Sequence, residues 1–235
     1  MQRESFGTLL SPIRAGEHML RNRVIMGSMH TRLETEPDGI SKQIAFYAER
    51  ARGEAAILIT GGFSPNAEGI FDPEGPRIDD RDEARSLRPI CEAVQAEGSL
   101  VCAQLLHAGR YAKIEGCVAP SPIRAPINRF IPREMTEADI LRTIEDFAVA
   151  AANAQAAGFD GVEVGHIHLR IVQARHVRAF RTFVILRGGA RAPDVNLCAA
   201  FAEGMGDAVA DAARSAHDKH GLAGEIGILN HVWPP

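Results

Sequence analysis

The chain has 235 residues, of which 46% are hydrophobic and 24% are charged, and its formal charge at pH 7 is −4. This composition is typical of a globular protein, and the length suits a single α/β barrel, which needs about 250 residues. With 26 basic against 30 acidic residues, the chain lacks the positive surface that binding to nucleic acid or to an anionic membrane requires. We therefore expect a small molecule as the partner.

The N-terminus and the cysteines indicate the compartment. Residues 1–14 lack the apolar core of a secretory signal, and no apolar run reaches the ~18 residues that span a bilayer. The four cysteines lie far apart, without the C-x-x-C spacing of a preformed zinc or iron–sulfur site. They are Cys91, Cys102, Cys117 and Cys198. We expect a cytoplasmic protein with reduced thiols.

Short apolar runs alternate with longer amphipathic segments, which is typical of βαβ units in a parallel sheet. The predicted strands are residues 23–26, 55–60, 99–107 and 159–164. The predicted helices are residues 41–52, residues 80–97 with an interruption or a kink near Pro89, and a helix that Thr136 caps and Gly158 ends. A proline-rich loop over residues 117–132 is long enough to suggest a function.

The C-terminal part departs from this pattern. At about 40 residues per βα unit, too little chain remains for eight units. Arginines crowd into residues 170–191, and residues 182–186, 197–217 and 225–229 would supply one more βαβ unit. We expect an α/β fold, a partial (β/α)8 (TIM-type) barrel in which residues 1–165 form the first four βα units. Residues 166–235 are expected to be a divergent segment, and we hypothesise a truncated or frameshifted gene.

Candidate site residues stand where the predicted strands end, because a parallel barrel builds its active site at the carboxyl ends of its strands. They are Ser28, Met29, His30, Gly61, Gly62, Gln104, His107, His166 and His168. Gln104 is the most informative, because it interrupts an apolar strand and a buried amide without partners costs roughly 1 to 3 kcal/mol. Its amide matches the edge of a flavin or another heterocycle.

Each of these residues also has an ordinary interpretation. A bond to a neighbouring strand or a structural water would satisfy Gln104 equally well. Gly61 and Gly62 are also consistent with a turn that needs positive φ. Met29 is equally consistent with a core position, and His30 and His107 with hydrogen-bonded histidines at the start of loops.

Five motifs carry a family resemblance, and they occur in the family's order. They are NRVIMGSMHT (22–31), AFYAERARGEAAILITGG (45–62), QLLHAGRY (104–111), APSPIRAPINRF (119–130) and GFDGVEV (158–164). Together they resemble the amino-terminal half of the FMN-binding barrel of the Old Yellow Enzyme / NADH:flavin oxidoreductase family. The resemblance is strongest to bacterial 2,4-dienoyl-CoA reductases.

This resemblance implies a set of roles. Ser28, Met29 and His30 would line an FMN cofactor, Gly61 would let the chain approach the flavin ring, and Gln104 would bond its pyrimidine edge. NAD(P)H would reduce the flavin, which would then pass hydride to an activated C=C of a dienoyl-CoA-like substrate while a protein acid protonates the other carbon. His168 falls where the wider family anchors its substrate.

The chain departs from the family after the fourth strand. Leu169 and Arg170 replace a glycine-tyrosine pair whose tyrosine is the proton donor, and Tyr47 and Tyr111 lie elsewhere. The sequence therefore assigns no catalytic residue and leaves turnover open. The family's four-cysteine iron–sulfur cluster is not recognisable.

Two other functions remain open on the sequence. One is a flavin-binding half barrel without catalysis, or one that depends on a partner, whose open sheet edge an oligomer would cover. The other is a metal site at His166 and His168, since residues two apart on a strand face the same side.

Overall fold

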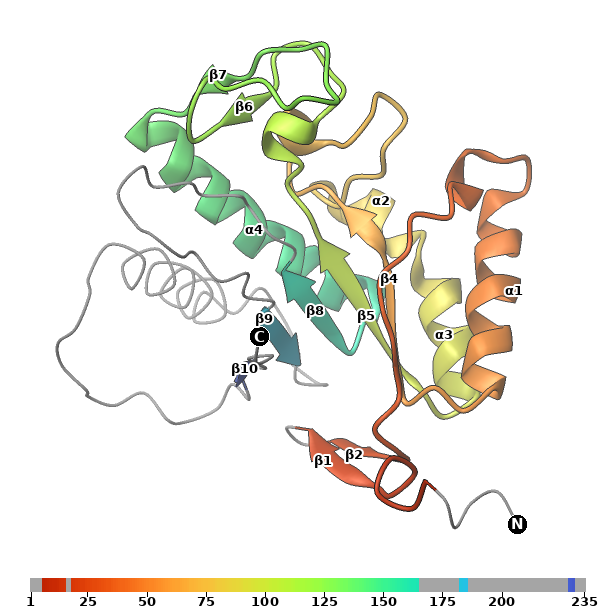
Figure 1. Ribbon diagram of the computed structural model, residues 1–235. Coiled ribbons are helices and arrows are strands. Elements are labelled where there is room, and N and C mark those ends of the chain that lie inside the picture. Colours follow the sequence, from red (N-terminus) through yellow and green to blue (C-terminus); the bar gives the residue numbers. More distant parts are fainter. Residues whose placement is uncertain (1–5, 16–17, 165–181, 186–227, 231–235) are drawn as a thin grey trace, which may run out of the picture.

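The computed structural model describes residues 6–15 and 18–164, together with the backbone of residues 182–185 and 228–230. Its centre is a six-stranded sheet with the order β10-β9-β8-β5-β4-β3 (Figure 1). Four neighbouring strands run parallel, as the sequence predicts. They are β3 (Ile25–Met26), β4 (Ile57–Phe63), β5 (Leu100–Leu105) and β8 (Gly161–Val164).

The two remaining strands of this sheet correct a prediction. β9 (Thr182–Ile185) pairs antiparallel with β8, and β10 (Ile228–Asn230) pairs antiparallel with β9. A further βαβ unit is therefore wrong for these strands, because such a unit joins parallel neighbours. The helix predicted over residues 197–217 lies outside the described residues.

The helices begin and end where local chemistry dictates. They are α1 (Gly39–Arg52), α2 (Arg81–Arg85), α3 (Arg88–Ala96) and α4 (Glu137–Ala157). The predicted interruption near Pro89 is confirmed, because α2 ends at Arg85 and α3 begins at Arg88. The alternative of a kink within one continuous helix is wrong. Pro89 lies in the first turn of α3, where its missing N–H costs no hydrogen bond.

The N-terminus of α4 is capped as predicted. The Thr136 hydroxyl accepts a hydrogen bond from the Asp139 N–H, and the Asp139 carboxylate accepts one from the Thr136 N–H. Gly158 ends the helix with φ of 102°, a left-handed conformation that favours glycine. This helix directs the chain into β8.

The glycine pair of β4 does not end the strand. β4 continues through Gly61 and Gly62 to Phe63, with a register shift against β5 between Ile59 and Gly62. Neither glycine has positive φ, so the turn interpretation is also wrong. A bulge of this kind re-aims side chains, and here it lies at the predicted site.

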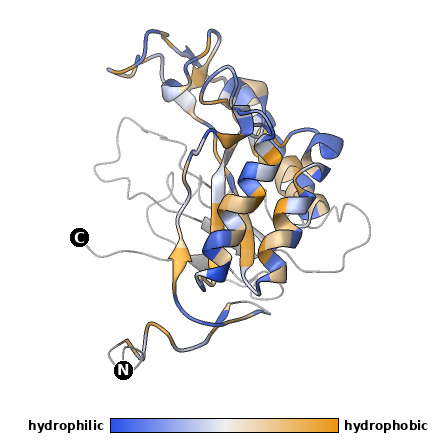
Figure 2. Ribbon diagram, turned by 90° about the vertical axis from the view of Figure 1, so that its right-hand side faces the viewer, coloured by the Kyte–Doolittle hydropathy of each residue, from blue (hydrophilic) through white to orange (hydrophobic). Residues whose placement is uncertain are grey.

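The two faces of the sheet have different surroundings. Helices cover one face (Figures 1 and 2), and there Val101, Ala103 and Leu105 pack into the main core. Residues that alternate with them point to the other face, where Cys102 packs with a smaller cluster. That cluster includes the hairpin of β1 (Ile13–Ala15) and β2 (His18–Leu20), which the sequence patterns did not reveal. Gln104 points to the same face as Cys102.

Short elements line the strand ends. η1 (Leu33–Thr35), η2 (Ala67–Gly69) and η3 (Gly109–Tyr111) are single 3-10 turns. The proline-rich segment 117–132 begins with β6 (Val118–Ala119), which pairs with β7 (Arg133–Glu134), so it is an anchored excursion. In residues 6–15 and 18–164, Cys91, Cys102 and Cys117 are buried and free. None of the helices described above is long and apolar enough to cross a membrane.

Candidate functional site

The residues predicted to form the site lie together at one rim of the sheet. The Ser28 hydroxyl donates a hydrogen bond of 2.7 Å to Gln104 Oε1. A Cβ atom on Gly61 would lie 3.0 Å from the Met29 carbonyl oxygen and 3.6 Å from His30 Cα. The prediction that these strand ends converge is therefore confirmed.

Gln104 is the centre of a buried hydrogen-bonded chain. Its Nε2 donates to Glu163 Oε2 at 2.6 Å, while its Oε1 accepts from Ser28. Gln104 is 8% exposed and Glu163 1% exposed, and the two are register partners on β5 and β8. The interpretation that a neighbouring strand satisfies this amide is thus also confirmed, although the amide still offers one N–H and one lone pair.

Gly62 makes this chain of bonds sterically feasible. β4 lies between β3 and β5, so the Gln104 amide must cross it to reach Ser28. A Cβ atom at position 62 would lie 3.0 Å from Gln104 Oε1 and 2.8 Å from Leu106 Cβ. The contact with Leu106 is closer than a Cβ atom tolerates, and the contact with Gln104 would require the amide to move by a few tenths of an ångström. Gly62 therefore opens the path between Gln104 and Ser28. The close approach of Gly61 to a flavin ring stays a prediction.

Two residues of the site were missed from the sequence. Glu163 was visible as a carboxylate inside the apolar run 159–164, and a buried carboxylate needs a specific partner. Tyr47 was noted from the sequence as a tyrosine away from the family's proton-donor position. Its hydroxyl accepts a 3.2 Å hydrogen bond from the Gly61 N–H at the β4 bulge, and burial raises its pKa.

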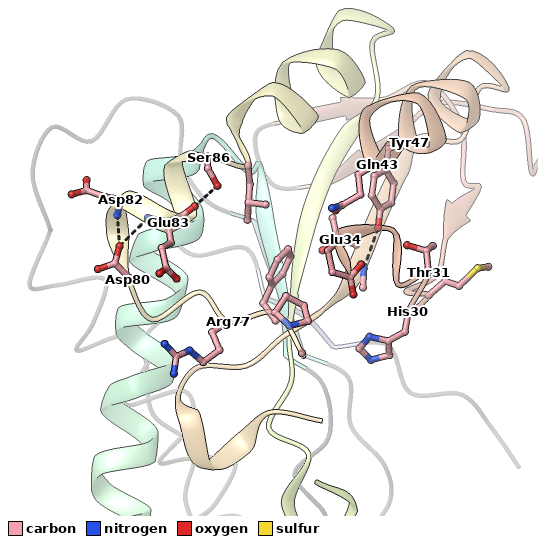
Figure 3. A pocket seen from close by; sticks show the side chains of 17 residues that line it. His30, Thr31, Glu34, Gln43, Tyr47, Arg77, Asp80, Asp82, Glu83 and Ser86 are labelled. Atoms are coloured by element: carbon pink, nitrogen blue, oxygen red, sulfur yellow. Dashed lines mark hydrogen bonds between the residues drawn. The ribbon is translucent and has the colours of Figure 1, made fainter. Parts of the chain in front are cut away.

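A cavity of about 700 Å³ lies beside the rim, next to α1 and α2 (Figure 3). Met29, His30 and Gly61 contribute to its lining, but Gln104 does not. Its charged lining consists of the carboxylates of Glu34, Asp80, Asp82 and Glu83 and the guanidinium of Arg77, so negative charge is in excess. The volume suits a small molecule, but this wall disfavours an anion, since like charges repel strongly near a protein surface.

Met29 and His30 occupy exposed positions beside that cavity. Met29 is 53% exposed, so the core interpretation of this residue is wrong. The His30 ring stacks on Phe71 with centroids 5.7 Å apart, and Lys113 Nζ lies 4.6 Å from the centroid of the same Phe71 ring. Phe71 thus contacts both His30 and Lys113, and Lys113 lies two residues after η3.

His107 is buried two residues after the end of β5. It is 2% exposed, and its Nδ1 accepts a 3.1 Å hydrogen bond from the Gly109 N–H. Its Nε2 has no partner in the part of the chain that the structure describes. Gly69 packs directly against the ring, where any side chain would overlap it. The interpretation as a hydrogen-bonded histidine therefore holds for one ring nitrogen.

Burial of His107 predicts a pH-dependent stability. Burial lowers its pKa to about 4, against about 6.5 in an unfolded chain. Between these values only the unfolded state takes up the proton, so the free energy of unfolding falls as the pH drops. The expected loss from pH 6.5 to pH 5 is about 2 kcal/mol. Urea unfolding at both pH values, compared with His107→Asn, measures it.

His107→Asn keeps an acceptor for the Gly109 N–H but cannot titrate in this range. The variant is therefore expected to lose less stability over the same pH interval. Equal losses in both proteins would mean that His107 is not the group responsible.

Several sequence predictions lie outside the described residues. His166, His168, Leu169 and Arg170 are among them, so the substrate-anchoring role and the metal interpretation stay predictions. Within residues 6–15 and 18–164, no group of three histidine, cysteine or acidic side chains is placed to hold a metal ion.

Comparison with known proteins gives a consistent result. Residues 8–169 match the model of the NADH:flavin oxidoreductase / NADH oxidase family. The chain is 40% identical over 164 residues to a metal reductase of Desulforamulus reducens, which covers 66% of this chain and 24% of that protein. It is 32% identical over 163 residues to an NADPH dehydrogenase of Bacillus subtilis, covering 68% of this chain and 48% of the relative.

Solved structures show the same likeness. A complex of 2-naphthoyl-CoA reductase with 2-naphthoyl-CoA superposes with a TM-score of 0.60 at 26% identity, over 67% of this chain and 27% of the other. The old yellow enzyme from Trypanosoma cruzi gives a TM-score of 0.60 at 28% identity, over 68% of this chain and 51% of that one. The chain thus spans between about a quarter and a half of the length of the proteins it matches.

Proposed function

Since the chain belongs to the NADH:flavin oxidoreductase / NADH oxidase family, we propose that it binds FMN and passes hydride from NAD(P)H to an activated C=C of a dienoyl-CoA-like substrate. Homologues of the Old Yellow Enzyme type use FMN and NAD(P)H. The observation that carries the proposal is the buried chain of hydrogen bonds through Ser28, Gln104 and Glu163. In this proposal residues 1–165 supply the first half of the FMN-binding barrel.

The residues at the rim fit a flat heterocycle with donors and acceptors along its edge. The Gln104 amide is held in one orientation, because its oxygen faces Ser28 and its nitrogen faces Glu163. One N–H and one lone pair of that amide remain for the pyrimidine edge of a flavin. Ser28, Met29, His30 and Gly61 would contribute the adjoining surface.

The chemistry divides between cofactor and protein. Bound FMN supplies the hydride transfer, whereas the protein supplies binding, orientation and electrostatics. Glu163 holds the Gln104 nitrogen, Gly62 leaves room for the amide, and Tyr47 fixes the Gly61 bulge by accepting its N–H. Such prior fixing of polar groups lowers the entropic cost of binding the cofactor.

Two similarities to other proteins, one in sequence and one in structure, support a thioester substrate. The motifs of residues 22–31 and 104–111 resemble those of 2,4-dienoyl-CoA reductases. One of the similar solved structures holds 2-naphthoyl-CoA, which is an aryl-CoA thioester. We therefore place an unsaturated acyl-CoA at the rim.

Anaerobic mixing tests the proposal. The FMN-loaded protein is treated with NADPH and then with NADH, and the visible absorbance of the flavin is followed. Loss of absorbance on adding either nucleotide, and its recovery on adding 2,4-hexadienoyl-CoA with formation of a reduced product, is the expected result. Flavin that neither nucleotide reduces would contradict the proposal.

A flavin-binding half barrel without catalysis is the second candidate. It is favoured by the edge position of β3, a two-residue strand that pairs only with β4 among the described strands. Unpaired edges recruit other chains, so an oligomer would cover it. FMN that stays bound without turnover, together with an oligomer in analytical ultracentrifugation, would favour this candidate over the first.

A further inference from the structure

The excursion formed by residues 117–132 is anchored to the strand-end side of the sheet. Asn128 is 5% exposed, and its Nδ2 donates to the backbone oxygens of Arg110 at 3.0 Å and of Ala112 at 2.6 Å. Ala125 is fully buried. These contacts hold the excursion on η3, which follows directly after β5, and Figure 1 shows β6 and β7 beyond the tips of β5 and β8.

Large apolar side chains nevertheless face outward from this anchored segment. Ile123 is 51% exposed, Ile127 is 76% exposed and Ile131 is 68% exposed. A single exposed isoleucine is ordinary. Three on one short excursion, whose other side chains include buried anchors, indicate a surface that another molecule covers.

Cations without acidic partners accompany these isoleucines. Residues 117–132 contain no aspartate or glutamate, and Glu115 and Glu134 lie outside them on either side. The Arg124 guanidinium bonds the Asn128 carbonyl oxygen at 3.1 Å, and the Arg129 guanidinium lies over the Phe130 ring at 4.6 Å. Neither arginine has a carboxylate within ion-pair distance among the residues that the structure describes. The surface therefore suits an anion with apolar parts.

The surface continues toward the proposed site. Lys113 is exposed, and it lies over the Phe71 ring on which His30 stacks. The cavity beside α1 and α2 has four carboxylates against Arg77, which disfavours a phosphate. On the side of Phe71, Arg32 pairs with the carboxylates of Asp72 and Glu74, which leaves Lys113 as a cation for an anionic group. Charge thus favours one side of the rim for an anionic ligand.

We propose that Lys113, Ile123, Arg124, Ile127, Arg129 and Ile131 form a docking surface for the phosphorylated nucleotide end of a coenzyme A thioester. Guanidinium groups bind phosphate through paired charge-assisted hydrogen bonds, and the isoleucines cover the apolar faces of the adenine and pantetheine groups. This inference rests on the proposed function, because it names the part of the chain that recognises the acyl carrier of that substrate.

The test compares two double variants of equal charge change. Arg124→Ala with Arg129→Ala removes the cations of the surface. Arg14→Ala with Arg23→Ala removes two exposed arginines of residues 13–23, near the β1–β2 hairpin at the other end of the sheet. The dissociation constant of 2,4-hexadienoyl-CoA is measured by isothermal titration calorimetry in the FMN-loaded protein at low salt, beside that of the N-acetylcysteamine thioester of the same acid. Matching circular dichroism spectra establish that each variant is folded.

The expected result is a rise of about ten-fold in the dissociation constant of the CoA thioester in the first variant only. Added salt is expected to reduce this difference between the variant and the parent protein, because it screens the charges. The N-acetylcysteamine thioester, which lacks the nucleotide, is expected to bind all proteins equally. An unchanged constant in the first variant, or no binding of the CoA thioester at all, would overturn the proposal. The proposal would also be overturned if the first variant bound the CoA thioester normally but no longer bound phosphatidylglycerol vesicles, or no longer self-associated.

Binding and reduction of the two thioesters together separate this proposal from the proposed function. Reduction of the N-acetylcysteamine thioester, combined with CoA binding that ignores Arg124 and Arg129, would retain the activity and reject the docking surface. Arginine-dependent CoA binding without any reduction would retain the surface and reject the activity.

Discussion

Replacing Gln104 with leucine is expected to weaken FMN binding about 100-fold, because the flavin loses two hydrogen bonds of about 1 to 1.5 kcal/mol each and 1.4 kcal/mol corresponds to ten-fold in affinity. The substitution also leaves Ser28 and Glu163 without their shared partner. Stability is therefore expected to fall by about 2 kcal/mol or more. Quenching of flavin fluorescence measures the affinity, and urea unfolding without FMN measures the stability.

Gln43→Leu is the matched control for that experiment. Gln43 lines the acidic cavity rather than the buried chain of bonds, and Figure 3 shows it on α1 near Tyr47. The same chemical change there is expected to leave FMN affinity within about two-fold, a difference well below 1 kcal/mol. The reverse pattern, with a large loss for Gln43→Leu and none for Gln104→Leu, would place the flavin in the cavity and contradict the account.

Replacing Gly62 with alanine is expected to break the bond between Ser28 and Gln104. The added Cβ atom would lie 2.8 Å from Leu106 Cβ and 3.0 Å from Gln104 Oε1, so the amide must move or the strand must shift. Overpacking of this kind costs about 1 to 3 kcal/mol. We expect a comparable fall in the free energy of unfolding and a loss of FMN affinity of about ten-fold or more. Denaturant unfolding and fluorescence titration measure both effects.

Gly27→Ala provides the comparison at the same rim. No atom lies within 4 Å of a Cβ built at Gly27, and its φ is not positive. This variant is expected to keep the affinity and stability of the parent chain. A Gly62→Ala protein with unchanged flavin affinity would show that the amide needs no passage across β4.

The sequence predicted the parallel strands and most helix boundaries because their signals are local. The apolar run before Gly61 and the cap at Thr136 depend on neighbouring residues only, and both agree with the structure. The interruption near Pro89 was predicted, but its form was not, because a proline in the first turn of a new helix and a proline inside one helix have the same local signal. The start of α3 has no side-chain cap that would have distinguished the two. The bulge in β4 depends on pairing with β5, which one strand's pattern does not reveal.

The candidate site was predictable in several of its members, although not in Glu163 and Tyr47, and it was not predictable in their connections. Gln104 was visible because an amide interrupts an apolar strand. Its partners were not, since Ser28 and Glu163 lie 76 and 59 positions away along the chain. Only the strand order, which brings β3, β4, β5 and β8 side by side, shows that Gly62 separates Ser28 from Gln104. The orientation of β9 likewise follows from pairing rather than from composition.

Titration of the purified chain with FMN is the most direct test of the flavin site at the strand rim. The account predicts that one equivalent of FMN binds, with a shifted visible absorbance spectrum and quenched fluorescence, and that the Gln104→Leu protein shows neither change at the same concentrations. Flavin that keeps its free spectrum in the presence of excess parent protein would contradict it.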